Sequence, residues 1–185
     1  MEETELIQLS KEGDIGSFNR LVELHERGVY NLAFRMLGDA QAAEDATQET
    51  FISAYRALRG FRGGDFRAWL LKIAANKCRD QLRALRRRPI ASLDSMEEDG
   101  VSLIHAGETP EDYAIRRELG HEIEGGLLSL PPDQRLAVIL SDIQGLSYKE
   151  IARVTASSIG TVRSRLSRGR ARLRDYLLER GELSP

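Results

Sequence analysis

The segment 61–88, FRGGDFRAWLLKIAANKCRDQLRALRRR, constrains the fold of this chain more than any other stretch. At about 100° per residue, its polar and apolar residues separate onto two flanks of a helix. The cationic flank consists of Lys72, Asn76, Arg79, Arg83 and Arg86. The apolar flank consists of Phe66, Trp69, Leu70, Ile73 and Ala74. A helix with this pattern buries its apolar flank, so the segment is predicted to pack against other helices or strands of the chain.

Helical periodicity also governs the rest of the chain, and period-2 alternation is nowhere sustained, so we expect an all-α fold. The pattern predicts helices over about 3–11, 15–37 and 40–58, with Gly13 and Gly38 ending the first two. A turn over 60–65 then leads to the basic helix, with Asp65 as its N-cap. These four helices predict one compact bundle, the N-terminal domain of residues 1–88.

The segment 89–108 has several acids, two glycines and few aliphatic residues, which predicts a flexible linker. The run Thr109-Pro110-Glu111-Asp112 then has the chemistry of a helix start. A helix to about 128 and another after Pro131-Pro132 follow. They open a C-terminal domain of residues 109–185.

The C-terminal domain has the spacing of a helix-turn-helix. Ser147 and Glu150 form a capping box for a short helix, a turn occupies 155–158, and a second helix follows. One side of that helix is expected to be buried and carries Ile159, Val162, Leu166, Gly169 and Leu173. The opposite face carries Gly160, Thr161, Ser164, Ser167 and Arg168. Flanking positions suited to phosphates carry Arg163, Arg165, Arg170 and Arg172.

Charge alternates along the chain in a way that the total of -2 conceals. Residues 1–58 sum to -6, residues 59–88 to +8, residues 89–126 to -8 and residues 145–185 to +5. Two separated cationic surfaces suit two contacts on one polyanion. The stripe on the basic helix has the spacing to follow a phosphate backbone, and the Asn76 amide is suited to reading a base edge.

Several function classes lack support in the sequence. No apolar run approaches the roughly 18 residues of a membrane span, and the acidic start is unlike a secretory signal, so we expect a cytoplasmic protein without membrane insertion. Cys78 is the single cysteine and the three histidines are scattered, so we expect no disulfide, metal or other cofactor, and Cys78 is interpreted as a packed residue. Without a nucleophile motif, we expect no catalytic residues and no enzyme activity.

Four motifs together resemble one family. They are AEDATQETF (43–51), FRAWLLKIAANKCRDQLR (66–83), LPPDQR (130–135), and GLSYKEIA with GTVRSRLSRGRARLR (145–174). In this order, the chain resembles a bacterial RNA polymerase sigma factor of the extracytoplasmic function (ECF) type. The resemblance implies a transcription initiation factor, acting in a stress or envelope response, with domains like sigma regions 2 and 4 on either side of the linker.

The resemblance also implies partners and site residues. Core RNA polymerase would be bound through the coiled coil of its largest subunit and through its flap, and an anti-sigma factor would regulate the chain. Candidate contacts for the coiled coil are Asp45, Gln48 and Glu49. Candidates for the minus-10 promoter element are Lys72, Asn76, Arg79, Arg83 and Arg86, with Gly63, Gly64 and Asp65 as a loop that receives a base turned out of the stack. Candidates for the minus-35 element are Gly160, Thr161, Arg163, Ser164, Arg165, Ser167 and Arg168.

The sequence departs from the family pattern at two places. The turn VTASS (154–158) lacks the glycine that many members have, which leaves the register of Thr161 and Ser164 open. Gly125-Gly126 interrupts an expected helix, and we interpret this pair as a hinge for docking a regulator.

Two other function classes stay open at this point. An autonomous helix-turn-helix regulator would bind DNA through the C-terminal basic surface alone. Its N-terminal bundle would act as a sensor, which does not need a basic surface of its own. A protein-interaction adaptor would use its charge blocks to dock acidic and basic partners, independently of promoter sequence.

Overall fold

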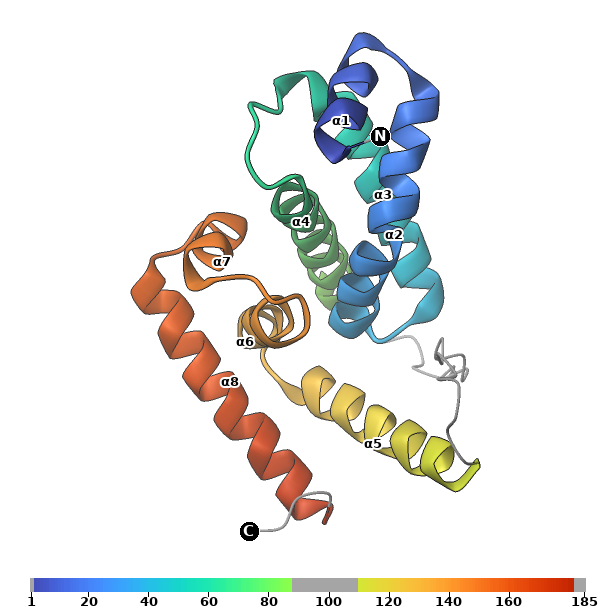
Figure 1. The fold of residues 1–185 in the computed structure, drawn as a ribbon. Helices are drawn as coiled ribbons and strands as arrows, with labels where there is room; N and C mark the ends of the chain where they lie inside the picture. Colours follow the sequence, from blue (N-terminus) through green and yellow to red (C-terminus); the bar gives the residue numbers. More distant parts are fainter. Residues whose placement is uncertain (1, 88–109, 182–185) are drawn as a thin grey trace.

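The computed structural model describes residues 2–87 and 110–181, and within these ranges all regular structure is helical (Figure 1). The predicted all-α class is confirmed. The predicted linker, residues 89–108, lies outside the described residues.

Four helices form the N-terminal unit: α1 (Glu3–Glu12), α2 (Ile15–Leu37), α3 (Ala40–Ala57) and α4 (Phe66–Arg87), with a 3-10 turn at Leu58–Gly60. The predicted bounds differ from these by a residue or so, because the ends carry local caps. Gly13 and Gly38 end α1 and α2 in the left-handed conformation, with φ of 105° and 74°. Asp65 accepts a hydrogen bond from the Ala68 amide at 2.9 Å at the start of α4, as predicted.

The core of this unit lies where α2, α3 and α4 meet. Its largest buried side chains include Leu21, Leu32, Met36, Phe66 and Leu70. Some apolar residues of α2 and α3 are exposed, among them Leu24 by 60% and Tyr55 by 41%. Both helices carry more apolar residues than one flank can bury, so part of each apolar face stays at the surface.

The C-terminal unit contains α5 (Pro110–Ser129), α6 (Pro132–Val138), a π-helical turn η2 (Ile139–Ile143), α7 (Tyr148–Thr155) and α8 (Ile159–Glu179). The predicted capping box is present, with Ser147 and Glu150 each bonding the other's backbone amide. Val162, Leu166 and Gly169 are buried along α8 as predicted, whereas Ile159 is 38% exposed, since it lies in the first turn of the helix.

Gly125 and Gly126 lie inside α5, which continues through them. A Cβ on Gly126 would stand 2.5 Å from Leu173 Cδ1, and one on Gly125 would stand 2.6 Å from the Tyr176 hydroxyl. The pair therefore allows α5 and α8 to approach closely, and the interpretation of a hinge is replaced by a packing role in a continuous helix.

The two units pack against each other. Helix α4 lies along α7, and α2 contacts both α5 and α6 (Figure 1). The basic helix of the first unit thus faces the helix-turn-helix of the second.

Candidate nucleic-acid interface

Helix α4 presents the two flanks that its sequence predicts. Phe66, Leu70 and Ala74 are buried. On the cationic flank, exposed side chains belong to Lys72, Asn76, Arg83 and Arg86. The fifth member, Arg79, is only half-buried and lies 3.3 Å from the Asp133 carboxylate of α6.

The buried flank of α4 is wider than predicted. Leu71, Ala75 and Cys78 are also buried, because α4 packs against α2, α3 and α7. Burial raises the pKa of the Cys78 thiol to about 12, which agrees with its interpretation as a packed residue.

The loop before α4 is open. Gly63 and Gly64 are exposed with φ of 91° and 96°, and a Cβ at either position would meet no atom within 4 Å. Glycine is therefore favoured here for its backbone conformation and leaves both faces of the peptide accessible. Trp69 packs against Phe61 and Phe66, with ring centroids 5.1 and 5.5 Å away, which agrees with its interpretation as a core residue.

Helix α8 begins at a polar cap. The Ser158 hydroxyl accepts a hydrogen bond from the Thr161 amide at 3.0 Å and lies 2.9 Å from the Thr161 hydroxyl, and Ser164 donates to the Thr161 carbonyl at 3.0 Å. Thr161 and Ser164 thus bond within the helix start. The exposed candidates on this helix are Gly160, Arg163, Ser167 and Arg168.

Two arginines of α8 are engaged by acids of the same unit. Arg165 lies 2.8 Å from Asp133, and Arg170 bonds Asp142 at 2.9 and 2.5 Å. The hydrogen bonds from Arg170 hold the pKa of Asp142 below its usual value. Arg170, expected on the phosphate-facing flank, is therefore occupied in bracing α8 against the end of η2.

The turn between α7 and α8 keeps its geometry without glycine. Ala156 adopts φ 50° and ψ 45°, the left-handed conformation that glycine takes more easily. Thr155 supports the turn by donating to the Ile151 carbonyl at 2.7 Å and by contacting Ser157. The turn is therefore retained without glycine, and its backbone is strained at Ala156.

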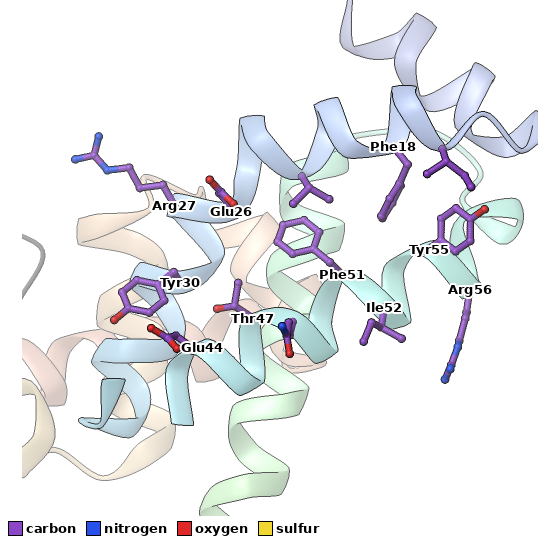
Figure 2. Close-up of a pocket in the computed structure, with 13 residues that line it drawn as sticks. Phe18, Glu26, Arg27, Tyr30, Glu44, Thr47, Phe51, Ile52, Tyr55 and Arg56 are labelled. Carbon is purple, nitrogen blue, oxygen red and sulfur yellow. The ribbon is translucent and has the colours of Figure 1, made fainter. Parts of the chain in front are cut away.

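A second surface, which we call the α2–α3 groove, lies on the N-terminal unit. It has a volume of about 1110 Å³ and an apolar floor that includes Phe18, Val22, Phe51 and Ile52. Figure 2 shows Glu26 and Arg27 of α2 and Glu44 and Arg56 of α3 placing charges around these apolar side chains.

The predicted polymerase contacts fall on α3 beside this groove. Gln48 lines it, and Asp45 and Glu49 are exposed on the same helix. Glu49 also lies 3.4 Å from Lys77 of α4. The sequence pattern did not predict the groove. It does contain the signal for one, because α2 and α3 carry more apolar residues than one buried face requires.

Known proteins resemble the chain in both units. Residues 21–88 match the family described as Sigma-70 region 2, and residues 121–173 match the family described as Sigma-70, region 4. The RNA polymerase sigma-H factor of Pseudomonas aeruginosa is 37% identical over 174 residues, covering 91% of this chain and 90% of that protein. The ECF RNA polymerase sigma factor SigE of Mycolicibacterium smegmatis is 42% identical over 161 residues. The chain belongs to the sigma-70 family, in its ECF group.

The ECF match to SigE covers 87% of this chain and 62% of the relative's length. Among solved structures, the sigma factor RpoE from Bartonella quintana, in complex with the anti-sigma factor NepR, has a TM-score of 0.68 and 26% identity, covering 88% of this chain and 98% of RpoE. The ECF sigma factor described here is a transcription initiation factor that directs RNA polymerase to promoters. Sigma factors in general are not enzymes.

Membrane-spanning helices and clusters of metal-binding side chains are both absent from the described residues. In residues 2–87 and 110–181, no helix has the length and apolarity that crossing a membrane requires. The same part of the chain holds no group of three or more His, Cys, Asp or Glu placed to bind a metal ion.

Proposed function

We propose a division of labour between two domains, residues 1–88 and 109–185. The first binds core RNA polymerase through the α2–α3 groove and recognises and opens the minus-10 element through α4. The second reads the minus-35 element through the start of α8. The observation that carries this proposal is the pair of arginine-rich helices, one in each unit of a sigma-70 family chain, that present exposed side chains suited to DNA.

The α2–α3 groove supports polymerase binding because it combines apolar area with a charged rim. Ile15 and Ile52 are 62% and 50% exposed, and both line it. A coiled coil from the largest polymerase subunit would cover these side chains and Gln48, which also lines the groove. It would contact Asp45 and Glu49 at the edge. The flap of the polymerase would bind the C-terminal domain.

Helix α4 supports a role in promoter opening. Lys72, Asn76, Arg83 and Arg86 form an exposed stripe that can follow one strand, with Arg79 between them. The open loop at Gly63, Gly64 and Asp65 would receive a base that has left the stack. Holding an extruded base offsets part of the cost of unpairing it, which is a few kcal/mol.

Helix α8 supports duplex reading in the major groove. Gly160 is exposed in its first turn, where the missing side chain permits close approach of the backbone to DNA. Thr161, Ser164, Ser167 and Arg168 would face base edges, and Arg163 and Arg165 would contact phosphates.

We also propose regulation by an anti-sigma factor, in a stress or envelope response in the cytoplasm. The support is the likeness to RpoE, whose structure was solved with the anti-sigma factor NepR. Such a partner would compete for the α2–α3 groove or for the DNA-facing helices.

Run-off transcription tests the proposal. Purified core polymerase is incubated with genomic fragments, with and without this chain, and the 5′ ends of the RNA are sequenced. New start sites that share two upstream elements are expected. If the folded chain gives no new starts while the same polymerase responds to another sigma factor, the proposal fails, and binding of a duplex by the chain alone would then favour an autonomous regulator.

A further inference from the structure

Lys11, in the last turn of α1, binds the backbone of the loop that leads into α4. Its Nζ donates a hydrogen bond to the Phe61 carbonyl at 2.6 Å and lies 5.5 Å from the centre of the Phe61 ring. The two residues are 50 positions apart, and α1 lies before the part of the chain, residues 21–88, that matches Sigma-70 region 2. The contact therefore joins a helix outside that match to the candidate base-receiving loop.

This loop is anchored at both of its ends. The Phe61 side chain is 7% exposed and packs against Phe66 and Trp69 of α4, with ring centroids 5.4 and 5.1 Å away. At the other end, the Asp65 carboxylate caps the first turn of α4. Residues 62–64 lie between the two anchors, and all three are exposed. The path of these residues is therefore decided by where the anchors stand.

The loop has little to hold its shape between the anchors. Gly63 and Gly64 adopt φ of 91° and 96°, and a glycine has a wide choice of other backbone conformations. A Cβ at either position would meet no atom within 4 Å, so packing does not restrain the loop from the side. A hydrogen bond from a charged donor is about twice as strong as a neutral one, which suits Lys11 to fixing the Phe61 carbonyl.

Helix α1 is itself held in place. Leu6 and Ile7 are buried in the core of the N-terminal unit. The Glu3 carboxylate lies 2.6 Å from Nε2 of His25 on α2. The helix also contacts the 3-10 turn at Leu58–Gly60, directly before the loop. These contacts give the lysine at the end of α1 a defined position beside the loop backbone.

We propose that Lys11 is a positioning residue for base capture, because it fixes residues 62–64 in the conformation that receives a base turned out of the minus-10 element. This inference rests on the proposed function of that loop. It gives α1 a part in promoter opening, exerted through the loop backbone and not through a contact between Lys11 and DNA. A loop that is already ordered binds a base without the entropy cost of ordering itself.

The test uses the full chain bound to core polymerase and a single-stranded probe of a minus-10 element that the run-off assay identifies. A matched set of probes has an abasic site at one position each. The ratio of the affinities for the intact and the abasic probe measures how much each base contributes to binding.

Three variants are compared in this assay. Lys11→Met keeps an apolar chain and removes the donor, and Lys11→Arg keeps a charged donor. Gln8→Met is the matched control, because Gln8 is exposed on the same helix and its side chain bonds Glu12, away from the loop.

Lys11→Met is expected to lower the affinity ratio at one position by about three- to tenfold, the range that corresponds to one net hydrogen bond, and to leave the ratio at the other positions unchanged. Lys11→Arg should retain most of the ratio, and Gln8→Met all of it. The inference is overturned if Lys11→Met changes no ratio, if it lowers every ratio equally, or if Lys11→Arg or Gln8→Met loses as much as Lys11→Met.

Salt dependence separates positioning from a direct contact between Lys11 and a phosphate. Loss of one phosphate contact reduces the slope of log affinity against log salt concentration by about 0.7 for a single strand. Lys11→Met should leave this slope unchanged. A shallower slope, with equal losses for the intact and the abasic probes, would contradict the positioning role.

The free chain supplies an independent measurement of the loop. Trp69 is the single tryptophan and packs against Phe61, so its fluorescence emission is sensitive to the anchor that Lys11 holds. Lys11→Met should shift this emission while circular dichroism at 222 nm stays unchanged, and Lys11→Arg should restore it. Unchanged emission in Lys11→Met would contradict the anchoring of Phe61.

The run-off assay separates this inference from the proposed function. Promoter-specific starts, together with no position-specific effect of Lys11→Met, would refute the role of Lys11 and leave the proposed function standing. Absence of new starts with the unaltered chain would refute the proposed function, and the inference with it.

Discussion

Arg135 is a buried charge that binds backbone carbonyls of its own C-terminal unit and of α2 in the N-terminal unit. Its Nη2 donates to the Leu128 carbonyl at 2.6 Å and to the Leu130 carbonyl at 3.1 Å, and its Nη1 donates to the Met36 carbonyl at 2.5 Å. Burial lowers the pKa of Arg135, and nearby Arg86 lowers it further, which shows that this charge is held at an electrostatic cost. The three carbonyls offset that cost only while all of them are bonded.

We therefore expect Arg135→Met to destabilise the chain although methionine fills much of the same volume. Removing the guanidinium leaves three carbonyls without their donor, and hydrogen bonds to charged groups contribute about 1.5–3 kcal/mol each without being additive. Allowing for partial compensation by water, the free energy of unfolding should fall by about 3 kcal/mol. With an m-value of about 1–3 kcal/mol/M, the midpoint in urea falls by at least about 1 M.

Urea unfolding followed by circular dichroism at 222 nm measures this change. Arg168→Met is the matched control, since Arg168 is exposed on α8, and its midpoint should move little. A loss below about 1 kcal/mol in Arg135→Met, within the range of ordinary surface substitutions, would refute the view that this arginine holds the three carbonyls.

Two further predictions concern local features of the C-terminal unit. Ala156→Gly should raise the free energy of unfolding by up to about 1 kcal/mol, because relief of a left-handed alanine exceeds the entropy cost of glycine; a loss of stability in thermal melts would contradict the strained turn. Asp142→Asn should weaken the dependence of the free energy of unfolding on pH in the acidic range. The folded pKa of Asp142 is lowered by Arg170, so its contribution is present above the unfolded pKa of about 3.9 and is lost as the pH falls through the folded value. Unfolding midpoints between about pH 5 and pH 2 check this, and parallel curves for the two proteins would contradict it.

The sequence predicted the helices well because their ends are decided locally. Gly13 and Gly38 impose left-handed backbone at the ends of α1 and α2, and Asp65 and Ser147 supply side-chain caps to the helices that follow them. These signals lie within a few residues of the ends that they decide.

Helical periodicity and capping signals could not predict contacts between segments that are distant in the sequence. Periodicity placed Arg79 and Arg165 on polar faces, yet it contains nothing about Asp133, which reaches both from a third helix. It also treated Gly126 as a weak point of a helix, when the neighbour that requires a glycine, Leu173, lies 47 positions away. The α2–α3 groove, which Tyr55 lines, was not predicted for a related reason, since two helices are required to form it.

In the proposed function, α3 contacts polymerase and α4 contacts the minus-10 element. One experiment compares Gln48→Ala with Arg79→Ala, measuring both the affinity for core polymerase and the fraction of promoter opened. Removing a central interface contact can cost about 1.4 kcal/mol of binding free energy, which corresponds to a tenfold loss of affinity.

We expect Gln48→Ala to weaken polymerase binding by about tenfold and to open promoter normally once polymerase is saturating. Arg79→Ala should bind polymerase within about threefold of the unaltered chain and open about tenfold less promoter, since one desolvated charge contact is worth about that much. If both variants are folded and lose polymerase binding equally, the division between α3 and α4 is contradicted.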